Sequence, residues 1–220
     1  MINQSDSDYL ETKEIVLGQQ GVHPRYQRLI DWIELTYQRR PINIYVDRVG
    51  PCWETRLSVI FCTEAEVGTF EDDSGINFNK SIQASIAAEH ERLEPWYAKF
   101  SLRQKRDALV IFTSFEKVAR CDVFDQVKED ALLGAVLKVF PDIWCVKKML
   151  SYPIIFFETD REIKGLDSGK KAEVRDAVGS LIADLDFCGC FADDVFIGFD
   201  SKENFEKSYQ SNWFYYSRDH

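Results

Sequence analysis

Two cysteines one residue apart, Cys188 and Cys190, are the most closely spaced thiols in the sequence. A thiolate is both a nucleophile and a ligand for soft metal ions, so this pair could exchange disulfides or take part in a metal site. A zinc site would need two further ligands, and the sequence has no C-x-x-C motif and no closely spaced histidine pair. Cys121 and Cys145 could contribute only if the fold brings them near. We therefore expect no metal ion. Cys188 and Cys190 are a candidate redox pair, and the simpler alternative is two reduced thiols at the end of a helix.

Acidic side chains are the second group of residues that could have a function, in this case the binding of a partner. One acidic group follows a predicted hairpin, and another precedes a predicted strand near an aromatic run. An acidic surface beside exposed aromatic side chains suits a protein interface, since Tyr and Trp often anchor binding. The alternative is that the charge serves solubility and that the aromatic run is partly buried. The candidate partner-binding residues are Glu71, Asp72, Asp73, Asp193, Asp194, Trp213 and Tyr215.

Other segments resemble known motifs but lack the residue spacing that those motifs require. Residues 165–170 resemble a phosphate loop, but the spacer is one residue short and Lys171 replaces the hydroxyl that would hold magnesium. His90-Glu91 lacks the second histidine of a zinc protease, because position 94 is Glu. Residues 71–75 do not fit a standard calcium loop. There is no G-x-S-x-G motif and no dinucleotide-binding fingerprint, so no catalytic residue is assigned and no cofactor is expected.

The overall charge narrows the range of partners. The chain has 220 residues, of which 45% are hydrophobic, and its formal net charge is −10. Such a surface repels nucleic acid and anionic membranes, and it favours a basic protein partner through electrostatic steering. The first eight residues are polar and acidic, unlike a signal peptide, and no uncharged apolar run is long enough to span a bilayer. We therefore expect a cytoplasmic protein with reduced cysteines.

The elements that must position these residues follow from hydrophobic periodicity. Residues 152–157, Tyr-Pro-Ile-Ile-Phe-Phe, predict a strand buried on both faces at the centre of a sheet. Gly50-Pro51 predicts a hairpin turn between two alternating segments. Strands are predicted at 42–49, 53–62, 108–113, 143–149, 152–157, 195–199 and 212–217, and helices from 24 to 40, after 79, at 122–140, at 168–186 and from 200.

This order predicts an α+β fold with a single mixed, largely antiparallel β-sheet and helices packed on it. We expect residues 1–22 to be a polar, loosely ordered lead-in and residues 23–220 to form one α+β domain. A division into two subdomains near residues 105–120 is the alternative. The sequence shows no internal repeat and does not define the oligomeric state.

Two classes of function remain. The first is a non-enzymatic interaction protein, with the general character of an inhibitor or immunity protein, that presents an acidic surface to a basic partner. The second is an enzyme whose carboxylate- or thiol-based site is assembled only by the fold. Because no catalytic motif is present, the sequence favours the first.

Overall fold

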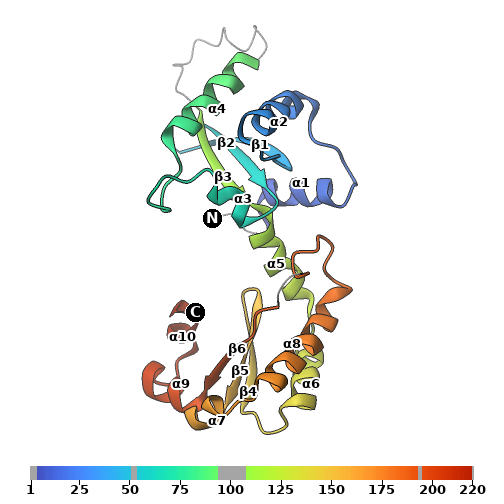
Figure 1. The fold of residues 1–220 in the computed structure, drawn as a ribbon, viewed down its shortest axis with the longest axis vertical. Helices are drawn as coiled ribbons and strands as arrows, with labels where there is room; N and C mark the ends of the chain where they lie inside the picture. The colour runs from blue at the N-terminus through green and yellow to red at the C-terminus, as the bar shows by residue number, and fades with distance from the viewer. Residues whose placement is uncertain (1–3, 51–53, 94–107, 193–194, 220) are drawn as a thin grey trace. The chain divides into compact units, whose positions relative to one another are not determined.

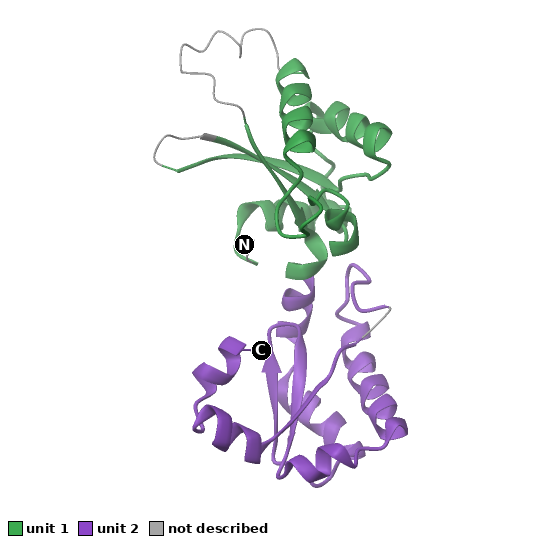
Figure 2. Cartoon of the chain, turned by 60° about the vertical axis from the view of Figure 1, so that its left-hand side comes forward, with its two compact units in different colours: residues 1–118 green, residues 119–220 purple. Residues whose placement is uncertain are grey.

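The computed structural model describes residues 4–50, 54–93, 108–192 and 195–219 (Figure 1). The fold is α+β, as predicted, but it contains two three-stranded sheets, so the prediction of a single sheet was wrong. Hydrophobic periodicity identifies strands but does not specify which strands pair, which is why the sequence left the two sheets undivided. The chain forms two compact units, residues 1–118 and residues 119–220 (Figure 2).

Unit 1, residues 1–118, is built on a sheet in the order β1-β2-β3. The central strand pairs antiparallel with β1, which confirms the predicted hairpin, and parallel with β3. Leu57, Val59 and Phe61 of β2 are buried against residues of α2 and α4. The elements are α1 (Ser7–Val16), α2 (Pro24–Tyr37), β1 (Asn43–Val49), β2 (Glu54–Phe61), α3 (Glu64–Gly68), α4 (Lys80–Leu93), β3 (Leu109–Ser114) and the start of α5 (Phe115–Gln126).

Local signals in the sequence explain where helices of unit 1 begin. Pro24 occupies the first turn of α2, where its missing amide hydrogen has no consequence. The Asn79 side chain accepts hydrogen bonds from the amides of Ser81 and Ile82 at the start of α4, as predicted for a capping residue. Helix α1 lies in the segment expected to be a loose lead-in. Its Tyr9 is buried and stacks on Phe115 with 5.2 Å between ring centroids.

Unit 2, residues 119–220, is built on a sheet in the order β4-β5-β6. Its central strand is the predicted segment 152–157, which pairs antiparallel with β4 and parallel with β6. Helices α6 and α8 cover one face and α9 and α10 cover the other (Figure 1). The elements are the rest of α5, then α6 (Glu129–Val139), β4 (Cys145–Met149), β5 (Tyr152–Phe157), α7 (Asp160–Lys164), α8 (Ser168–Ala183), β6 (Gly198–Ser201), α9 (Lys202–Tyr209) and α10 (Trp213–Asp219).

Several predicted elements differ from the structure. The helix expected at 122–140 is two helices, because α5 ends at Gln126 and Lys128 is the N-cap of α6. The strand expected from residue 195 begins at Gly198. The strand expected at 212–217 is helix α10. Its aromatic run has high β-propensity. Trp213 and Tyr216, however, are three residues apart and pack together on the second face of the sheet. This tertiary packing favours the helix over the strand.

The two units repeat one order of elements without an obvious sequence repeat. A helix, a hairpin, a five-residue helix, a longer helix, a parallel strand and a final helix follow one another in both. Each five-residue helix begins with a capping box, formed by Thr63 and Glu66 in α3 and by Thr159 and Glu162 in α7. Helices α2 to α5 with β1 to β3 therefore correspond to helices α6 to α9 with β4 to β6.

The correspondence extends to the register of the parallel strands. The last residue of the central strand pairs with the last residue of the parallel strand in both units, Phe61 with Ser114 and Phe157 with Ser201. Beyond each pair, the same backbone hydrogen bond closes the sheet: Glu116 N donates to Cys62 O over 3.0 Å, and the Glu203 amide donates to the carbonyl of Glu158 over 3.3 Å. The repeat is therefore one of backbone arrangement.

Candidate functional site

The candidate site lies in the turn that follows helix α8. This helix begins where the Asp167 side chain accepts hydrogen bonds from the amides of Gly169 and Lys170. Gly165 is the C-cap of α7, so the glycines of residues 165–170 lie at helix ends, as predicted when the phosphate-loop motif was rejected. Val178 and Ile182 bury one face of the helix in the core of unit 2. The buried face fixes the end of α8, and the chain then turns through residues 184–191.

Asp186 is the centre of the turn. Its Oδ1 accepts a hydrogen bond from the Cys190 amide over 3.0 Å, and its Oδ2 accepts one from the Phe191 amide over 2.9 Å. Both thiols also donate to Oδ1, from the Sγ of Cys190 over 3.3 Å and from the Sγ of Cys188 over 3.7 Å. The carboxylate oxygen and the two sulfur atoms all lie within 4.8 Å of one another.

Two further features hold the turn in this shape. Gly189, between the cysteines, has a φ of +71°, a left-handed conformation that residues with a side chain rarely adopt. This conformation lets both thiols face the same carboxylate. The Arg120 guanidinium donates from Nε to the Cys190 carbonyl over 2.7 Å and lies over the Phe191 ring at 5.1 Å. The cysteines are half-buried, so solvent reaches both.

Burial and hydrogen bonds act in opposite directions on the titratable groups of this turn. Burial alone would raise the pKa of Asp186, but the bonds from Phe191 and Cys190 outweigh it and lower the pKa. The hydrogen bond between the thiols lowers the pKa of Cys188, and the same bond, together with burial, raises the pKa of Cys190. The two thiols are therefore chemically distinct.

The structure brings together some of the cysteines that the sequence suggested as redox or metal-binding residues, but not all of them. Within the described ranges, Asp186, Cys188 and Cys190 are the only group of three metal-ligating side chains this close together, and neither Cys121 nor Cys145 joins them. Burial raises the pKa of the Cys145 thiol, which lies in β4. The sequence argument overlooked Asp186. The signal was present as D-x-C-x-C, but this spacing becomes informative only once the turn is known.

The acidic group after the first hairpin has a structural role in part. Asp72 Oδ1 accepts hydrogen bonds from the Ser74 hydroxyl and, over 3.0 Å, from the Ser74 amide. The bond from the hydroxyl lowers the pKa of Asp72. Glu71 forms an isolated β-bridge with Phe78, whereas Asp73 is exposed. Asp72 therefore stabilises its own loop, and Asp73 is the member of the group most available to a partner.

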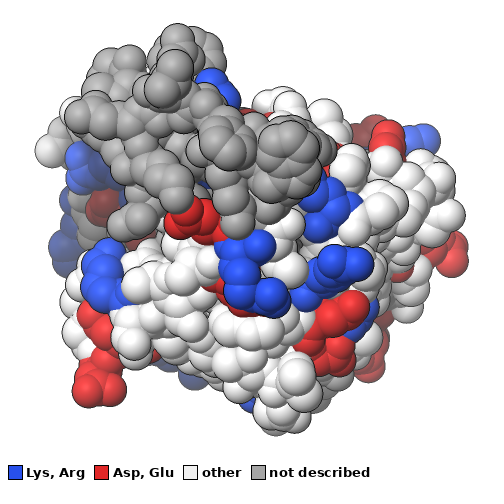
Figure 3. Space-filling model, turned by 90° about the horizontal axis from the view of Figure 1, so that it is seen from above, with Lys and Arg blue, Asp and Glu red and all other residues white. Residues whose placement is uncertain are grey.

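The second acidic group, Asp193 and Asp194, lies outside the described residues. On the face shown in Figure 3, acidic and basic side chains are interspersed, with no continuous acidic patch among the described residues visible there. The acidic-surface hypothesis thus stays a prediction.

The two aromatic candidates have different environments. Trp213 packs into the second core of unit 2, where it stacks on Phe205 with ring centroids 4.1 Å apart and lies 4.9 Å from the Lys147 Nζ. Tyr215 is 46% exposed, and its neighbour Phe214 is 71% exposed. Phe214 was not selected from the sequence. The helical form of the segment explains the difference, because it turns Trp213 inward and the next two side chains outward.

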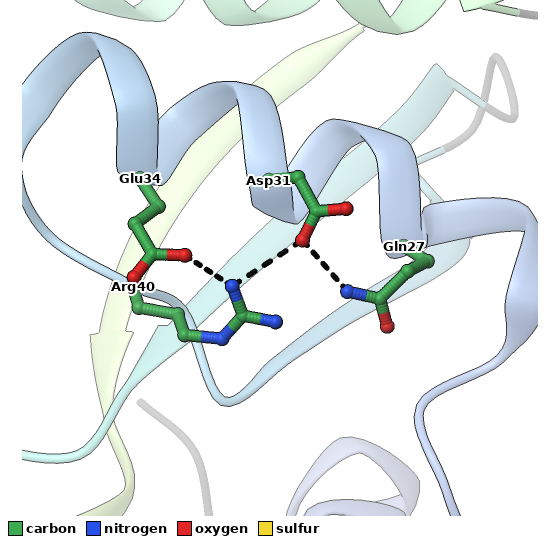
Figure 4. Close-up of polar contacts among 4 residues, drawn as sticks. All are labelled: Gln27, Asp31, Glu34 and Arg40. Atoms are coloured by element: carbon green, nitrogen blue, oxygen red, sulfur yellow. Dashed lines mark hydrogen bonds and ion pairs between the residues drawn. The ribbon is translucent and has the colours of Figure 1, made fainter.

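A shallow hollow of about 270 Å³ lies between α1 and α2. Its lining is mainly apolar, and its one charged residue is Arg40. Figure 4 shows that the Arg40 guanidinium bonds to Asp31, over 3.3 Å, and to Glu34. Asp31 also accepts a hydrogen bond from the Gln27 amide over 2.8 Å. Since two carboxylates already pair with Arg40, the hollow does not present this charge to an anionic ligand.

Comparisons of the chain with protein-family models, with curated proteins and with solved structures each find no match. Among the helices of the described ranges, none combines the length and the apolar character needed to cross a membrane. The arrangement of the side chains is therefore the basis for a proposed function, and the turn at residues 186–191 is the site with the most defined chemistry.

Proposed function

We propose that unit 2 carries a redox-active dithiol, in which Cys188 and Cys190 form a reversible disulfide with a partner disulfide as the oxidant. The observation that supports this proposal is the convergence of both thiols on the Asp186 carboxylate within 4.8 Å. A disulfide requires about 2.05 Å between sulfur atoms, so closing the bond needs a local rearrangement of the turn. The half-buried cysteines lie within reach of a small disulfide.

The positions of the two thiols assign them different roles. The Cys190 thiol makes the shorter bond to Asp186, at 3.3 Å against 3.7 Å for Cys188, and its own amide donates to the same oxygen. Cys190 is therefore the thiol that keeps its proton. Cys188 acts as the nucleophile, and Cys190 as the thiol that resolves the intermediate.

The exchange runs in two balanced steps. The Cys188 thiolate attacks one sulfur of a disulfide R–S–S–R, forms a mixed disulfide and releases one thiolate R–S⁻. The Cys190 thiol passes its proton to the released R–S⁻, and its sulfur then attacks the Cys188 sulfur and releases the second thiolate. The protein dithiol is oxidised to the Cys188–Cys190 disulfide, and R–S–S–R is reduced to two thiols.

The test is equilibration of the reduced full chain with mixtures of oxidised and reduced glutathione, followed by acid quenching and thiol alkylation. We expect a species with two fewer labels, in which peptide mass spectrometry locates the link between Cys188 and Cys190. A bond that closes across a single residue is strained, so its reduction potential should lie above the about −300 mV typical of structural disulfides.

Matched variants make this test specific. Cys188→Ser and Cys190→Ser should each abolish the linked species, whereas Cys62→Ser, a change at an exposed cysteine of unit 1, should leave it unchanged. At pH 7, iodoacetamide should label Cys188 before Cys190. Full labelling of every cysteine under all mixtures, or a link that survives Cys188→Ser, would contradict the proposal.

We also propose, as a second function, an interface for a basic protein partner in the cytoplasm. The observation that favours it is the adjacent exposure of Phe214 and Tyr215 on α10. The candidate residues of each unit are tested separately: Asp73→Asn in unit 1 should slow association mainly at low salt, and Tyr215→Ala in unit 2 should speed dissociation at any salt. A pull-down followed by binding kinetics on the retained partner tests this. Equal retention by the wild type and both variants would contradict it.

A further inference from the structure

The distances in the turn after α8 also match a metal site. In a tetrahedral zinc site, Zn–S bonds are about 2.3 Å and Zn–O bonds about 2.0–2.2 Å, which places a sulfur and an oxygen ligand about 3.6 Å apart. The Asp186 Oδ1 lies 3.3 Å from the Cys190 Sγ and 3.7 Å from the Cys188 Sγ. These two separations bracket the oxygen–sulfur edge of such a tetrahedron, and the three ligand atoms all lie within 4.8 Å of one another.

We propose that the reduced turn binds a divalent cation of the zinc class through Asp186, Cys188 and Cys190. The site goes beyond the proposed redox function: both use the reduced thiols, but cation binding does not need the disulfide to form. Two sulfur ligands and one oxygen ligand select zinc-class ions over magnesium and calcium, which prefer six or more oxygen ligands.

The surroundings of the turn support a preformed site. The Cys190 and Phe191 amides fix the Asp186 carboxylate, and the Arg120 guanidinium fixes the Cys190 carbonyl. Such outer contacts orient ligands and contribute strongly to metal affinity. Gly189 provides the left-handed conformation that aims both sulfur atoms at one point. The cation would displace the thiol protons, so binding should release protons.

Three protein ligands leave one tetrahedral position for water or another small ligand. This pattern is that of zinc sites with an open coordination position, as distinct from closed structural sites with four protein ligands. The turn is half-buried, so solvent can supply the fourth ligand. No metal site was predicted from the sequence, because further ligands were expected only from Cys121 and Cys145, whereas the proposed third ligand, Asp186, lies two residues upstream of Cys188.

The experiment is a titration of the reduced full chain, under anaerobic conditions and without chelators, with Co²⁺ as a spectroscopic probe and then with Zn²⁺ in competition. We expect one Co²⁺ per chain, visible d–d bands with the intensity of tetrahedral coordination, and a sulfur-to-cobalt charge-transfer band that Zn²⁺ abolishes. A chromophoric chelator then gives the Zn²⁺ affinity.

Variants assign the ligands. Asp186→Asn should weaken Zn²⁺ binding at least tenfold, and Cys188→Ser or Cys190→Ser should do so and also reduce the charge-transfer band. Cys62→Ser and Cys121→Ser are the matched controls and should change neither the affinity nor the spectrum. If a variant is unfolded by circular dichroism, Zn²⁺ protection of Cys188 and Cys190 against alkylation in the wild type replaces it.

The outcomes separate this inference from the redox proposal. Stoichiometric Co²⁺ binding in a chain that never forms the disulfide supports the cation site and overturns the redox function. A reversible disulfide in a chain that shows no charge-transfer band overturns the cation site alone. Binding that survives Cys188→Ser and Cys190→Ser overturns the cation site.

Discussion

Units 1 and 2 share a backbone arrangement but differ in what covers the second face of each sheet. In unit 1 this face carries buried polar side chains: the Asn43 amide donates to the Thr12 hydroxyl of α1 over 3.1 Å, and Ser58 is fully buried. In unit 2 the position that corresponds to Ser58 is Ile154, which packs in a cluster with Phe205 and Tyr216. One topology therefore tolerates a polar second face or an aromatic one.

The two units also differ in whether their buried serine hydroxyls have hydrogen-bond partners. Ser201 Oγ donates to Asp160 and accepts from the Asn204 amide over 2.8 Å. Ser114 occupies the corresponding place in unit 1, and its buried hydroxyl makes no hydrogen bond among the described residues; the same is true of Ser58. The repeat therefore preserves the pairing of backbone groups between strands, whereas the hydrogen bonds of the side chains differ between the two units.

The largest expected effect comes from the central strands. Ile155→Ala in β5 and Ile60→Ala in β2 each remove buried methyl groups, so each should lower the free energy of unfolding by about 2–5 kcal/mol. We expect each variant to destabilise its own unit. Urea unfolding, followed by the fluorescence of Trp32 for unit 1 and of Trp144 for unit 2 in single-tryptophan backgrounds, measures this. A loss below about 1 kcal/mol for Ile155→Ala would contradict the buried, central place of β5 in its sheet.

The next effect concerns the aromatic face of unit 2. The Tyr216 hydroxyl donates to Asp200 Oδ2 over 2.7 Å, and hydrogen bonds to charged groups contribute about 1.5–3 kcal/mol. Tyr216→Phe should lower the free energy of unfolding of unit 2 by that amount at pH 7. Chemical denaturation measures it, and Tyr215→Phe, at an exposed ring of the same helix, is the control.

The same tyrosine gives a pH dependence. Burial, together with the bond to Asp200, raises the pKa of Tyr216 in the folded state above the usual value near 10. Above pH 10 the unfolded state therefore loses this proton while the folded state keeps it, so stability that is present below pH 10 falls as the pH rises. The fall should be smaller in Tyr216→Phe. Parallel stability curves for the two proteins between pH 9 and 11 would contradict this expectation.

A smaller effect separates the two equivalent serines. Ser201→Ala removes the N-cap of α9 and should destabilise unit 2 by about 0.5–2 kcal/mol. Ser114→Ala removes a buried hydroxyl without a partner, so it should be neutral or slightly stabilising. Thermal unfolding of the two variants compares them directly. Equal losses would mean that the serines have equivalent roles after all.

The smallest effect tests the polar face of unit 1. Burial raises the pKa of Asp8, so the stability that its protonated form contributes is present below the usual carboxyl pKa and is lost as the pH rises through the folded pKa. Asp8→Asn should therefore stabilise unit 1 at pH 7 and should flatten its stability between pH 4 and 7. The unfolding midpoint in urea across this range measures both. A destabilised Asp8→Asn would show that the charge is needed.

Local patterns in the sequence were sufficient to find most of the elements. The period-two alternation found the first hairpin, the apolar run found the central strand of unit 2, and Pro24 and Asn79 marked helix starts. Pairing between distant strands has no local signal, so the second sheet was missed. The aromatic run at the C-terminal end was misassigned for a similar reason, because its helical form depends on packing against Phe205.

The candidate site was predictable only in part. Cys188 and Cys190 stand out by their spacing alone. Asp186 does not, since the chain has many acidic residues and its role depends on two backbone amides and on the left-handed Gly189. The side chains of this site are brought together by the backbone conformation of a turn, so they could not be recognised as a group before that conformation was known.

The repeated sheets have a consequence for biosynthesis. Strands with the same pairing pattern within one chain can exchange partners during folding, which is a characteristic failure of repeat proteins. Because each sheet is formed by a continuous stretch of chain, the ribosome delivers β1, β2 and β3 before β4 appears. At about 5–20 residues per second, residues 119–220 take roughly 5–20 s to follow. The first sheet thus has seconds in which to close, and the order of translation itself keeps the edges of β1 and β3 away from their later counterparts.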